Sequence, residues 1–253
     1  MTARTKLDLF KPRPTWVRYT LGYAALFLGI IVGKIKVKGR DYIPKEGPFI
    51  VVANHFNVSE PPFFLFALQR PINFLVASDQ VIEWYNYWAV WLYGFIPTNR
   101  THLAPSTIKM AKKVFANKEI LGVFPEGDTL SDELRSAKPG AVFLSTLGQV
   151  PIVPMSIYGL KKGLWDYIFS GIRPKISIKV GKPFGPFELP KDRSQKEKEL
   201  KYIGDEMMCR IAALLPEECH GKYKNNLDKK ISINKILVPV SYTHLTLPTK
   251  RIV

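Results

Sequence analysis

The chain has 253 residues, of which 46% are hydrophobic and 23% are charged. These values are ordinary for a globular protein and exclude a disordered, collagen-like or disulfide-rich chain. The formal net charge of +16 is high, and such a surface attracts an anionic partner: nucleic acid, an acidic membrane or a phosphorylated substrate. The two cysteines, Cys209 and Cys219, have no metal-binding spacing and the four histidines are scattered, so the sequence predicts no metal site.

The amino terminus is basic and leads into an uncharged run at residues 19–33. This run is shorter than the roughly 20 apolar residues that a spanning helix needs. Arg18 precedes it, and Lys34 and Arg40 follow it, which is typical of a helix that lies on or dips into a bilayer. The alternative is a buried core helix. We expect residues 1–37 to form an N-terminal membrane-associating helix, and no signal-peptide cleavage site is evident.

Short apolar or alternating runs then alternate with segments of helical periodicity. The runs predict strands at residues 34–43, 48–54, 71–78, 120–127, 151–159 and 173–184. The periodic segments predict helices at residues 61–68, 82–94, 105–118, 138–148 and 194–215. The second of these helices is rich in aromatic residues, and the first begins with two prolines, which suit a first helical turn.

This alternation predicts an α/β fold. We expect a single domain at residues 38–225, with a largely parallel central sheet flanked by helices. The pattern fails after it, so residues 226–253 are expected to be a C-terminal tail outside the core. The final stretch, SYTHLTLPTKRIV, resembles translated adapter or vector sequence more than a folded end.

Polar stretches lie next to three predicted elements, where an open α/β sheet binds its ligands. They are NHFNVSE, FIPTNR and FPEGDTL. His55 has an ordinary pKa of about 6.5 and is suited to act as a general base, and a carboxylate such as Glu60 orients such a base. Glu60 precedes Pro61, near a helix amino terminus, which favours its ionised form. The alternative for this pair alone is a solvated loop.

Four sequence blocks decide between an acid–base pair and a solvated loop. They are NHFNVSE at residues 54–60, GFIPTNR at 94–100, FPEG at 124–127 and VPIVP at 150–154. In this order and at these intervals they resemble the glycerolipid acyltransferase family, in its PlsC-like 1-acylglycerol-3-phosphate acyltransferase group. The resemblance covers about residues 38–225, and it is more specific for the superfamily than for the substrate.

The resemblance implies transfer of a fatty acyl group from a thioester, acyl-CoA or acyl carrier protein, to the hydroxyl of a lysophospholipid. His55 and Glu60 would be the catalytic residues: His55 takes the hydroxyl proton and Glu60 orients it. Neither a cofactor nor a covalent acyl-enzyme is implied. Substrate binding would fall to residues of the first three blocks, namely Asn54, Arg100, Glu126 and Gly127. Arg100 would pair with the acceptor's phosphate.

The chain departs from the family pattern in three places. The family's Asp is replaced by Glu60, and its Thr-Arg-Ser after the Glu-Gly pair is replaced by Asp128-Thr129-Leu130. Ser78 stands where many relatives carry a lysine. Two cations are therefore missing near the expected phosphate site. Arg135 or Lys138, from the same loop, is the expected substitute, and we assign Lys138 to substrate binding.

The most concrete function implied is phospholipid biosynthesis, with 1-acylglycerol-3-phosphate converted to phosphatidic acid at the cytoplasmic face of the cell membrane. The expected partners are an anionic phospholipid membrane, the lysophospholipid and the thioester donor. The alternative is a lipid-binding pseudoenzyme that keeps the fold but has little turnover. Nucleic acid is not expected as a partner, because charge alone supports it and no DNA-binding motif is present.

Overall fold

The computed structural model describes residues 12–78, 91–99, 102–128, 131–160, 162 and 164–225, without the side chains of residues 164 and 165. The strands are β1 (Lys34–Lys38), β2 (Phe49–Ala53), β3 (Ile72–Ala77), β4 (Ile96–Thr98), β5 (Ile120–Val123), β6 (Ile152–Tyr158) and β7 (Lys175–Val180). The α-helices are α2 (Thr15–Val32), α3 (Pro61–Leu68), α5 (Pro105–Ala116), α6 (Gly140–Gly148), α7 (Leu164–Ser170) and α8 (Arg193–Ala212). Short 3-10 turns cover Arg40–Tyr42, Glu217–Cys219 and Gly221–Tyr223.

The described strands form one 7-stranded sheet in the order β1-β7-β6-β2-β5-β3-β4. Every neighbouring pair is parallel except β6 and β7. The prediction of an α/β domain with a largely parallel sheet is confirmed. All five residues of β2 are buried, which is why its sequence is continuously apolar rather than alternating.

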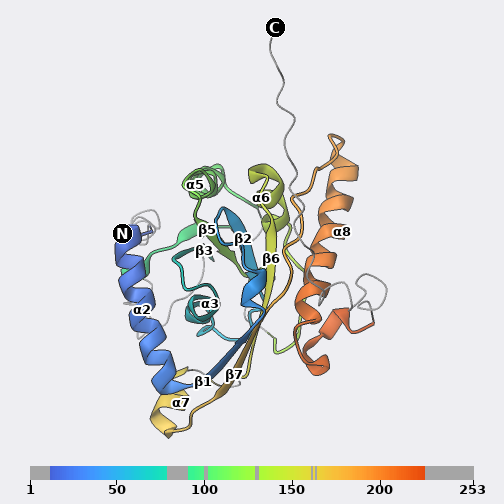
Figure 1. Ribbon diagram of the computed structural model, residues 1–253. Coiled ribbons are helices and arrows are strands. Elements are labelled where there is room, and N and C mark those ends of the chain that lie inside the picture. Colours follow the sequence, from blue (N-terminus) through green and yellow to red (C-terminus); the bar gives the residue numbers. More distant parts are fainter. Residues whose placement is uncertain are drawn as a thin grey trace.

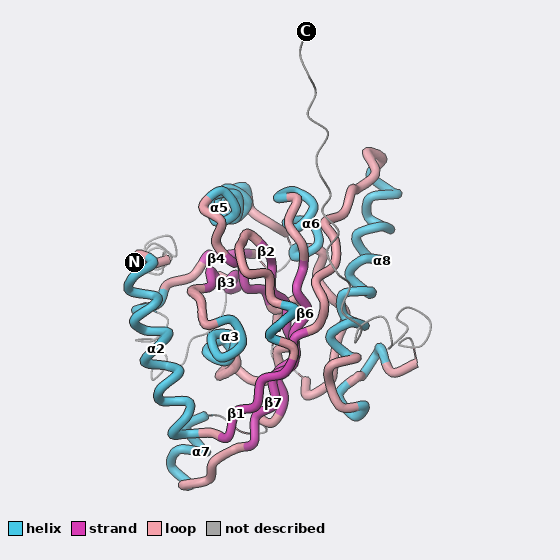
Figure 2. Tube along the Cα trace, viewed as in Figure 1, coloured by secondary structure: helices cyan, strands magenta, loops and turns pink. Residues whose placement is uncertain are grey.

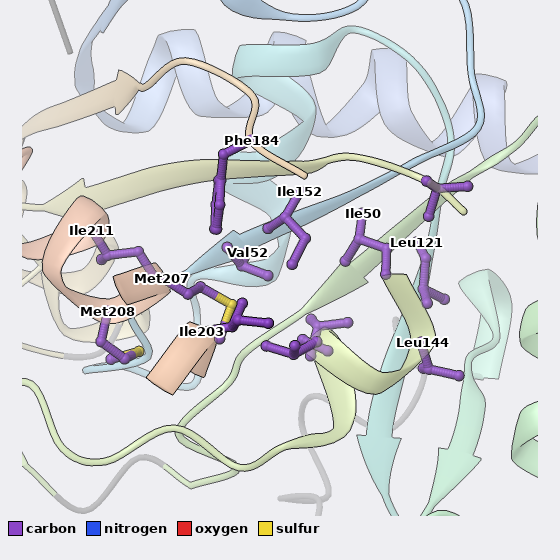
Figure 3. Close-up of a cluster of buried hydrophobic side chains, with 14 of the residues drawn as sticks. Ile50, Val52, Leu121, Leu144, Ile152, Phe184, Ile203, Met207, Met208 and Ile211 are labelled. Atoms are coloured by element: carbon purple, nitrogen blue, oxygen red, sulfur yellow. The ribbon is translucent and has the colours of Figure 1, made fainter. Parts of the chain in front are cut away.

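Helices cover both faces of the sheet (Figure 1). Helices α5, α6 and α8 pack on one face, where Ile50, Val52 and Ile152 meet Met207 and other apolar residues of α8 (Figure 3). Helix α3 packs on the opposite face against alternate residues of the same strands, such as Val51 and Val153. The alternation of side chains along each strand thus supplies two separate cores.

Helix α2 lies outermost, on the far side of α3 from the sheet (Figure 2). It packs on α3 through Gly22 and Gly29, and a Cβ at Gly29 would lie 2.2 Å from a ring carbon of Phe66. Its outward face is apolar: the exposed large side chains are Trp16, Tyr19, Tyr23, Phe27, Leu28, Ile30 and Ile31. The helix is long and apolar enough to cross a membrane by length and composition, with a mean hydropathy of 1.4, and only 11% of it is buried.

The one buried cation of α2 fastens it to the sheet. Arg18 is 4% exposed. Its guanidinium donates to Asn73 Oδ1 at 2.8 Å and to Glu119 Oε2 at 3.2 Å, and its Nε donates to the carbonyl of Arg13. Helix α2 is therefore inverted relative to a soluble amphipathic helix, with an ion pair inside and apolar side chains outside.

The strand register brings several chain ends to one edge of the sheet. Ala53 at the end of β2 pairs with Met155, and Tyr158 at the end of β6 pairs with Ser177 near the start of β7. Lys175 at the start of β7 pairs with Lys34, which follows α2 directly. The carboxyl edge of the parallel strands, where α/β proteins bind ligands, thus also receives the end of α2 and all of α7.

The structure differs from the sequence predictions in three elements. Strand β4 and helix α7 were not predicted, because one has three residues and the other seven, too few for a periodic pattern. The expected boundary between residues 37 and 38 cuts β1, which pairs with β7 and belongs to the sheet. Most of the predicted 82–94 helix and all of the tail at 226–253 lie outside the described residues.

Candidate active site

The loop after β2 turns back on itself and brings Glu60 to His55. Asn57 shapes the turn: its Oδ1 accepts the N–H of Ser59 at 2.9 Å, and its carbonyl accepts the N–H of Glu60 at 3.1 Å. Helix α3 then starts at Pro61, whose fixed φ and missing N–H suit a first helical position. Asn57 also donates from Nδ2 to the carbonyl of Lys162 at 3.0 Å, which ties this loop to the segment before α7.

His55 and Glu60 form the predicted pair. Nδ1 of His55 lies 3.1 Å from Oε2 of Glu60, and the same oxygen accepts the N–H of Phe56 at 2.9 Å. Glu60 is 2% exposed and the His55 side chain 17%. A carboxylate on Nδ1 keeps the proton there and leaves Nε2 as the basic nitrogen. Nε2 makes no hydrogen bond to any other described residue, so it is available to a hydroxyl.

Burial dominates the acid–base properties of both groups. It lowers the pKa of His55 to about 3, with Asp128 raising it and Arg135 lowering it further. Burial raises the pKa of Glu60 well above its usual range, against the hydrogen bonds from the Asn57 and Phe56 backbone that lower it. The expectation that the helix amino terminus favours ionised Glu60 is wrong for the net shift. The side chain makes no capping bond to α3 and turns into the buried loop instead.

An aromatic stack holds the His55 ring from the side. The ring of Phe124, in the turn after β5, lies 3.8 Å from it between centroids, at an interplanar angle of 18°. Phe64 of α3 packs edge-on against Phe124 at 5.1 Å. The imidazole is thus fixed by an apolar face as well as by a carboxylate. The sequence reasoning missed Phe124, although it belongs to the FPEG block.

Glu126 lies behind the loop rather than in an open pocket. It is 4% exposed. Its Oε1 accepts the N–H of His55 at 3.1 Å, and its Oε2 accepts the N–H of Arg135 at 3.0 Å. Burial raises its pKa to about 7, although these two backbone bonds and the Arg135 charge lower it. Both oxygens hold the backbone on which the site is built, and the assignment of Glu126 to substrate binding stays a prediction.

Asn54 is likewise engaged with the backbone. Its side chain is fully buried, Nδ2 donates to the Ile157 carbonyl at 2.8 Å, and Oδ1 accepts the Ile157 N–H at 2.9 Å. The amide therefore continues the hydrogen-bond ladder between β2 and β6 one residue past the strand. Both polar atoms of Asn54 are thus engaged inside the sheet, and its assignment to substrate binding stays a prediction. Asn54 fixes the direction in which the next residue, His55, leaves the sheet.

Gly127, Lys138 and Arg135 lie on the side of the site formed by the turn after β5. Gly127 has φ of +73°, a left-handed conformation that favours glycine, and a Cβ there would lie 3.4 Å from Cγ of Lys138. The Lys138 side chain therefore crosses this turn, and the residue is exposed. The Arg135 side chain, 34% exposed, donates to the Asp128 carbonyl at 2.7 Å, with Nε 3.8 Å from Glu126.

The structure thus brings together His55, Glu60, Glu126, Gly127 and Lys138, and places Asn54 beneath them. Arg100 lies outside the described residues, so its predicted role stays a prediction. Within the described part of the chain no cluster of three or more His, Cys, Asp or Glu side chains could hold a metal ion.

Comparison with known proteins shows similarity to acyltransferases. The model of the family described as "Acyltransferase" matches residues 34–158. The chain is 26% identical over 153 residues to a 1-acyl-sn-glycerol-3-phosphate acyltransferase of Bacillus subtilis (strain 168), covering 60% of this chain and 74% of the relative. It is 25% identical over 193 residues to a protein of the same name from Chlamydomonas reinhardtii, covering 74% of this chain but only 55% of that protein.

A solved structure shares the fold. The crystal structure of the 1-acyl-sn-glycerophosphate acyltransferase PlsC from Thermotoga maritima superposes with a TM-score of 0.52 at 19% identity, covering 73% of this chain and 75% of that chain. The residues 34–158 that the family model matches include the loop after β2, the turn after β5 and all of β6. These three segments carry the candidate site. The chain is thus similar to the acyltransferase family over residues 34–158, and to curated proteins named 1-acyl-sn-glycerol-3-phosphate acyltransferases.

Proposed function

We propose that this protein transfers a fatty acyl group from a thioester, acyl-CoA or acyl carrier protein, to the free hydroxyl of 1-acylglycerol-3-phosphate, giving phosphatidic acid. The observation that carries the proposal is the His55–Glu60 pair, with Nδ1 held at 3.1 Å and Nε2 available. Relatives named for this activity support the choice of acceptor. This chemistry requires no metal and no cofactor, because the thioester is a co-substrate.

The reaction follows from the geometry of the pair. Nε2 of His55 takes the proton of the acceptor hydroxyl as the oxygen attacks the thioester carbonyl carbon, forming the new C–O bond. The imidazolium that forms is stabilised by the carboxylate of Glu60, whose Oε2 accepts Nδ1–H at 3.1 Å. When the C–S bond breaks, the thiolate takes the proton from Nε2, so His55 returns to its starting state. No acyl-enzyme forms.

The low pKa of His55 has a defined consequence for this step. The free imidazole is neutral throughout the physiological range, so the base needs no prior deprotonation. A hydroxyl bound at Nε2 transfers its proton only as its oxygen attacks the thioester carbonyl, and the Glu60 carboxylate stabilises the imidazolium as it forms. Protonation of His55 is therefore coupled to attack of the acceptor oxygen on the thioester. This coupling disfavours a stable imidazolium, which would leave His55 unable to act as a base.

Basic side chains beside the site supply the counter-charge for the acceptor's phosphate. Lys138 is exposed on the turn after β5, and Arg135 lies near enough to His55 to lower its pKa. Arg100 of the second block is the third candidate, from the sequence resemblance alone. A planar guanidinium binds phosphate with two hydrogen bonds, whereas lysine acts as a point charge, so Arg135 and Arg100 would orient the head group more strictly.

Helix α2 supports a location at the membrane, which we propose to be the cytoplasmic face of the cell membrane. Its large outward side chains are apolar and Lys34 and Lys36 follow it, an arrangement that suits a helix buried in an anionic leaflet. A lysophospholipid acceptor lies in such a leaflet, and the end of α2 reaches the same edge of the sheet as the end of β2.

A donor and acceptor screen tests the proposal. Detergent-solubilised protein is incubated with labelled acyl-CoA or acyl carrier protein thioester and, in turn, lysophosphatidic acid, glycerol-3-phosphate and lysophosphatidylcholine. Labelled phosphatidic acid from lysophosphatidic acid alone supports the proposal. Turnover of another acceptor would replace the assigned substrate, and lipid binding without any product would favour the pseudoenzyme.

A further inference from the structure

Helix α7 and the turn after it expose a second set of apolar side chains, apart from those of α2. Phe169 is 83% exposed, Ile172 58% and Ile168 39%. These three residues, called here the α7 patch, lie within a span of five positions, 168–172, in a segment that connects β6 to β7. Exposure of large apolar groups this close together is costly in water and marks a surface that a partner covers.

The α7 patch is continuous with the outward face of α2. Arg173, one residue past Ile172, donates from its guanidinium to the carbonyls of Ile30 at 2.6 Å and Gly33 at 3.4 Å, at the end of α2. Figure 1 shows α7 beside this end of the helix. Since α2 exposes Phe27, Ile30 and Ile31 over its last two turns, the two elements present their apolar groups at one end of the molecule.

Basic residues surround this end of the molecule. Lys34, Lys162, Arg173 and Lys175 are all exposed there. Apolar side chains flanked by lysine and arginine fit the boundary between acyl chains and anionic head groups, where each such cation adds attraction to the surface. A protein partner would instead need a compensating acidic surface, so the occupant we assign is an anionic lipid leaflet.

The α7 segment is also linked to the catalytic loop. Nδ2 of Asn57 donates to the carbonyl of Lys162, which precedes α7, and Asn57 shapes the turn that brings Glu60 to His55. Val58, the next residue of this loop, is 50% exposed. The register already places α7 at the carboxyl edge of the sheet, so the patch and the site share that edge.

We propose that α7 and the turn after it insert into the same leaflet as the second half of α2, as a second membrane anchor that holds the His55 loop at head-group level. The inference rests on the proposed membrane role of α2 but not on acyl transfer. Two attachment points at one edge fix the orientation of the domain, whereas α2 alone would leave it free to rotate about the helix.

Site-specific depth measurement tests this inference. Both native cysteines are buried, so Phe169→Cys, Phe27→Cys and Tyr202→Cys are each labelled with an environment-sensitive fluorophore. Tyr202 on α8 is the matched control, an aromatic residue that is 56% exposed away from the patch. The variants are bound to vesicles of phosphatidylglycerol and phosphatidylcholine that contain lipids brominated in the acyl chains.

We expect the labels at positions 169 and 27 to be quenched to a similar extent, and the label at 202 to stay unquenched. Quenching at 27 with the label at 169 still in water would overturn the proposal, and so would an absence of quenching at both. A second variant, Phe169→Asp, is expected to lower vesicle partitioning about tenfold, with Tyr202→Asp unchanged. Because none of these readouts uses turnover, failure of the proposed reaction leaves the test intact.

Discussion

Nδ1 of His55 lies 3.1 Å from Oε2 of Glu60, and the carboxylate that holds this nitrogen is itself almost completely buried. The pair comes from a loop of only seven residues, 54–60, between a strand and a helix, so its geometry depends on local hydrogen bonds. Asn57 closes the turn, Glu126 holds the His55 backbone and Phe124 stacks on the imidazole. The site is therefore rigid before any substrate binds, which is the condition for efficient proton transfer.

For catalysis, the negative charge of Glu60 is expected to matter more than the length of its side chain. Glu60→Gln places an amide beside Nδ1, removes the acceptor for the imidazolium charge and is expected to lower kcat by about 10²–10⁴-fold with little change in KM. Glu60→Asp keeps the charge and is expected to retain activity. Steady-state kinetics with both variants checks this. Equal losses in the two would mean that Glu60 acts through its packing alone.

Substitutions of Asn54 and of Lys138 are expected to have different effects. The first should lower the free energy of unfolding, and the second should weaken binding of the acceptor. Asn54→Leu leaves the N–H and carbonyl of Ile157 buried and unpaired, so the free energy of unfolding should fall by about 2–4 kcal/mol. Lys138→Ala, at an exposed position, should leave it unchanged and raise KM for the phosphate-bearing acceptor. Urea unfolding and kinetics on both variants give the comparison. A raised acceptor KM in Asn54→Leu at full stability would support the substrate-binding assignment.

The free energy of unfolding should depend on pH because His55 is buried. Its pKa is 6.5 when unperturbed and about 3 in the folded protein, so between these values the unfolded chain binds a proton that the folded chain does not. The contribution of His55 to stability is therefore fully present above pH 6.5 and is lost as pH falls toward 3.

The size of this effect can be isolated with His55→Gln. The free energy of unfolding of the wild type relative to this variant is expected to fall by at most about 1.4 kcal/mol per pH unit between about pH 6 and about pH 4. Urea unfolding over a pH series measures it. A difference that does not change with pH would show that the imidazole titrates normally in the folded protein.

Arg18 is expected to hold α2 on the domain. Arg18→Met leaves Asn73 and Glu119 without their cation and should lower the free energy of unfolding by about 2–3 kcal/mol, because one partner of a largely buried pair is removed. Limited proteolysis should then cut between α2 and β1. The double variant Arg18→Met/Glu119→Gln should recover part of the loss. Unchanged stability and protease resistance in the single variant would contradict this role of Arg18.

The sequence predicted the elements that have a clear period or a continuous apolar run, such as β2, β6 and α8. Strand β4 has three residues and begins Ile-Pro, so neither its length nor its composition indicates a strand, and only pairing with β3 defines it. The inverted character of α2 depends on the burial of Arg18 by Asn73 and Glu119, which lie 55 and 101 residues away.

The parts of the site that depend on residues close together in the sequence were predictable. His55 and Glu60 are five residues apart, and a loop between a strand and a helix suffices to join them. The backbone contacts of Asn54 were not predictable, because its partner, Ile157, is 103 residues distant and on another strand. Those of Glu126 were not predictable for the same reason: its partner His55 is 71 residues away. Burial, which sets the pKa of all three titratable groups of the site, follows from these distant contacts.

The most direct test of the account is acyl transfer to lysophosphatidic acid by wild type, His55→Ala and His102→Ala. His102 is an exposed histidine outside the catalytic pair and serves as the matched control. Mass-spectrometric detection of phosphatidic acid is expected to give equal rates for wild type and His102→Ala, and no product above background for His55→Ala. Undiminished product from folded His55→Ala would contradict the assignment of His55 as the base.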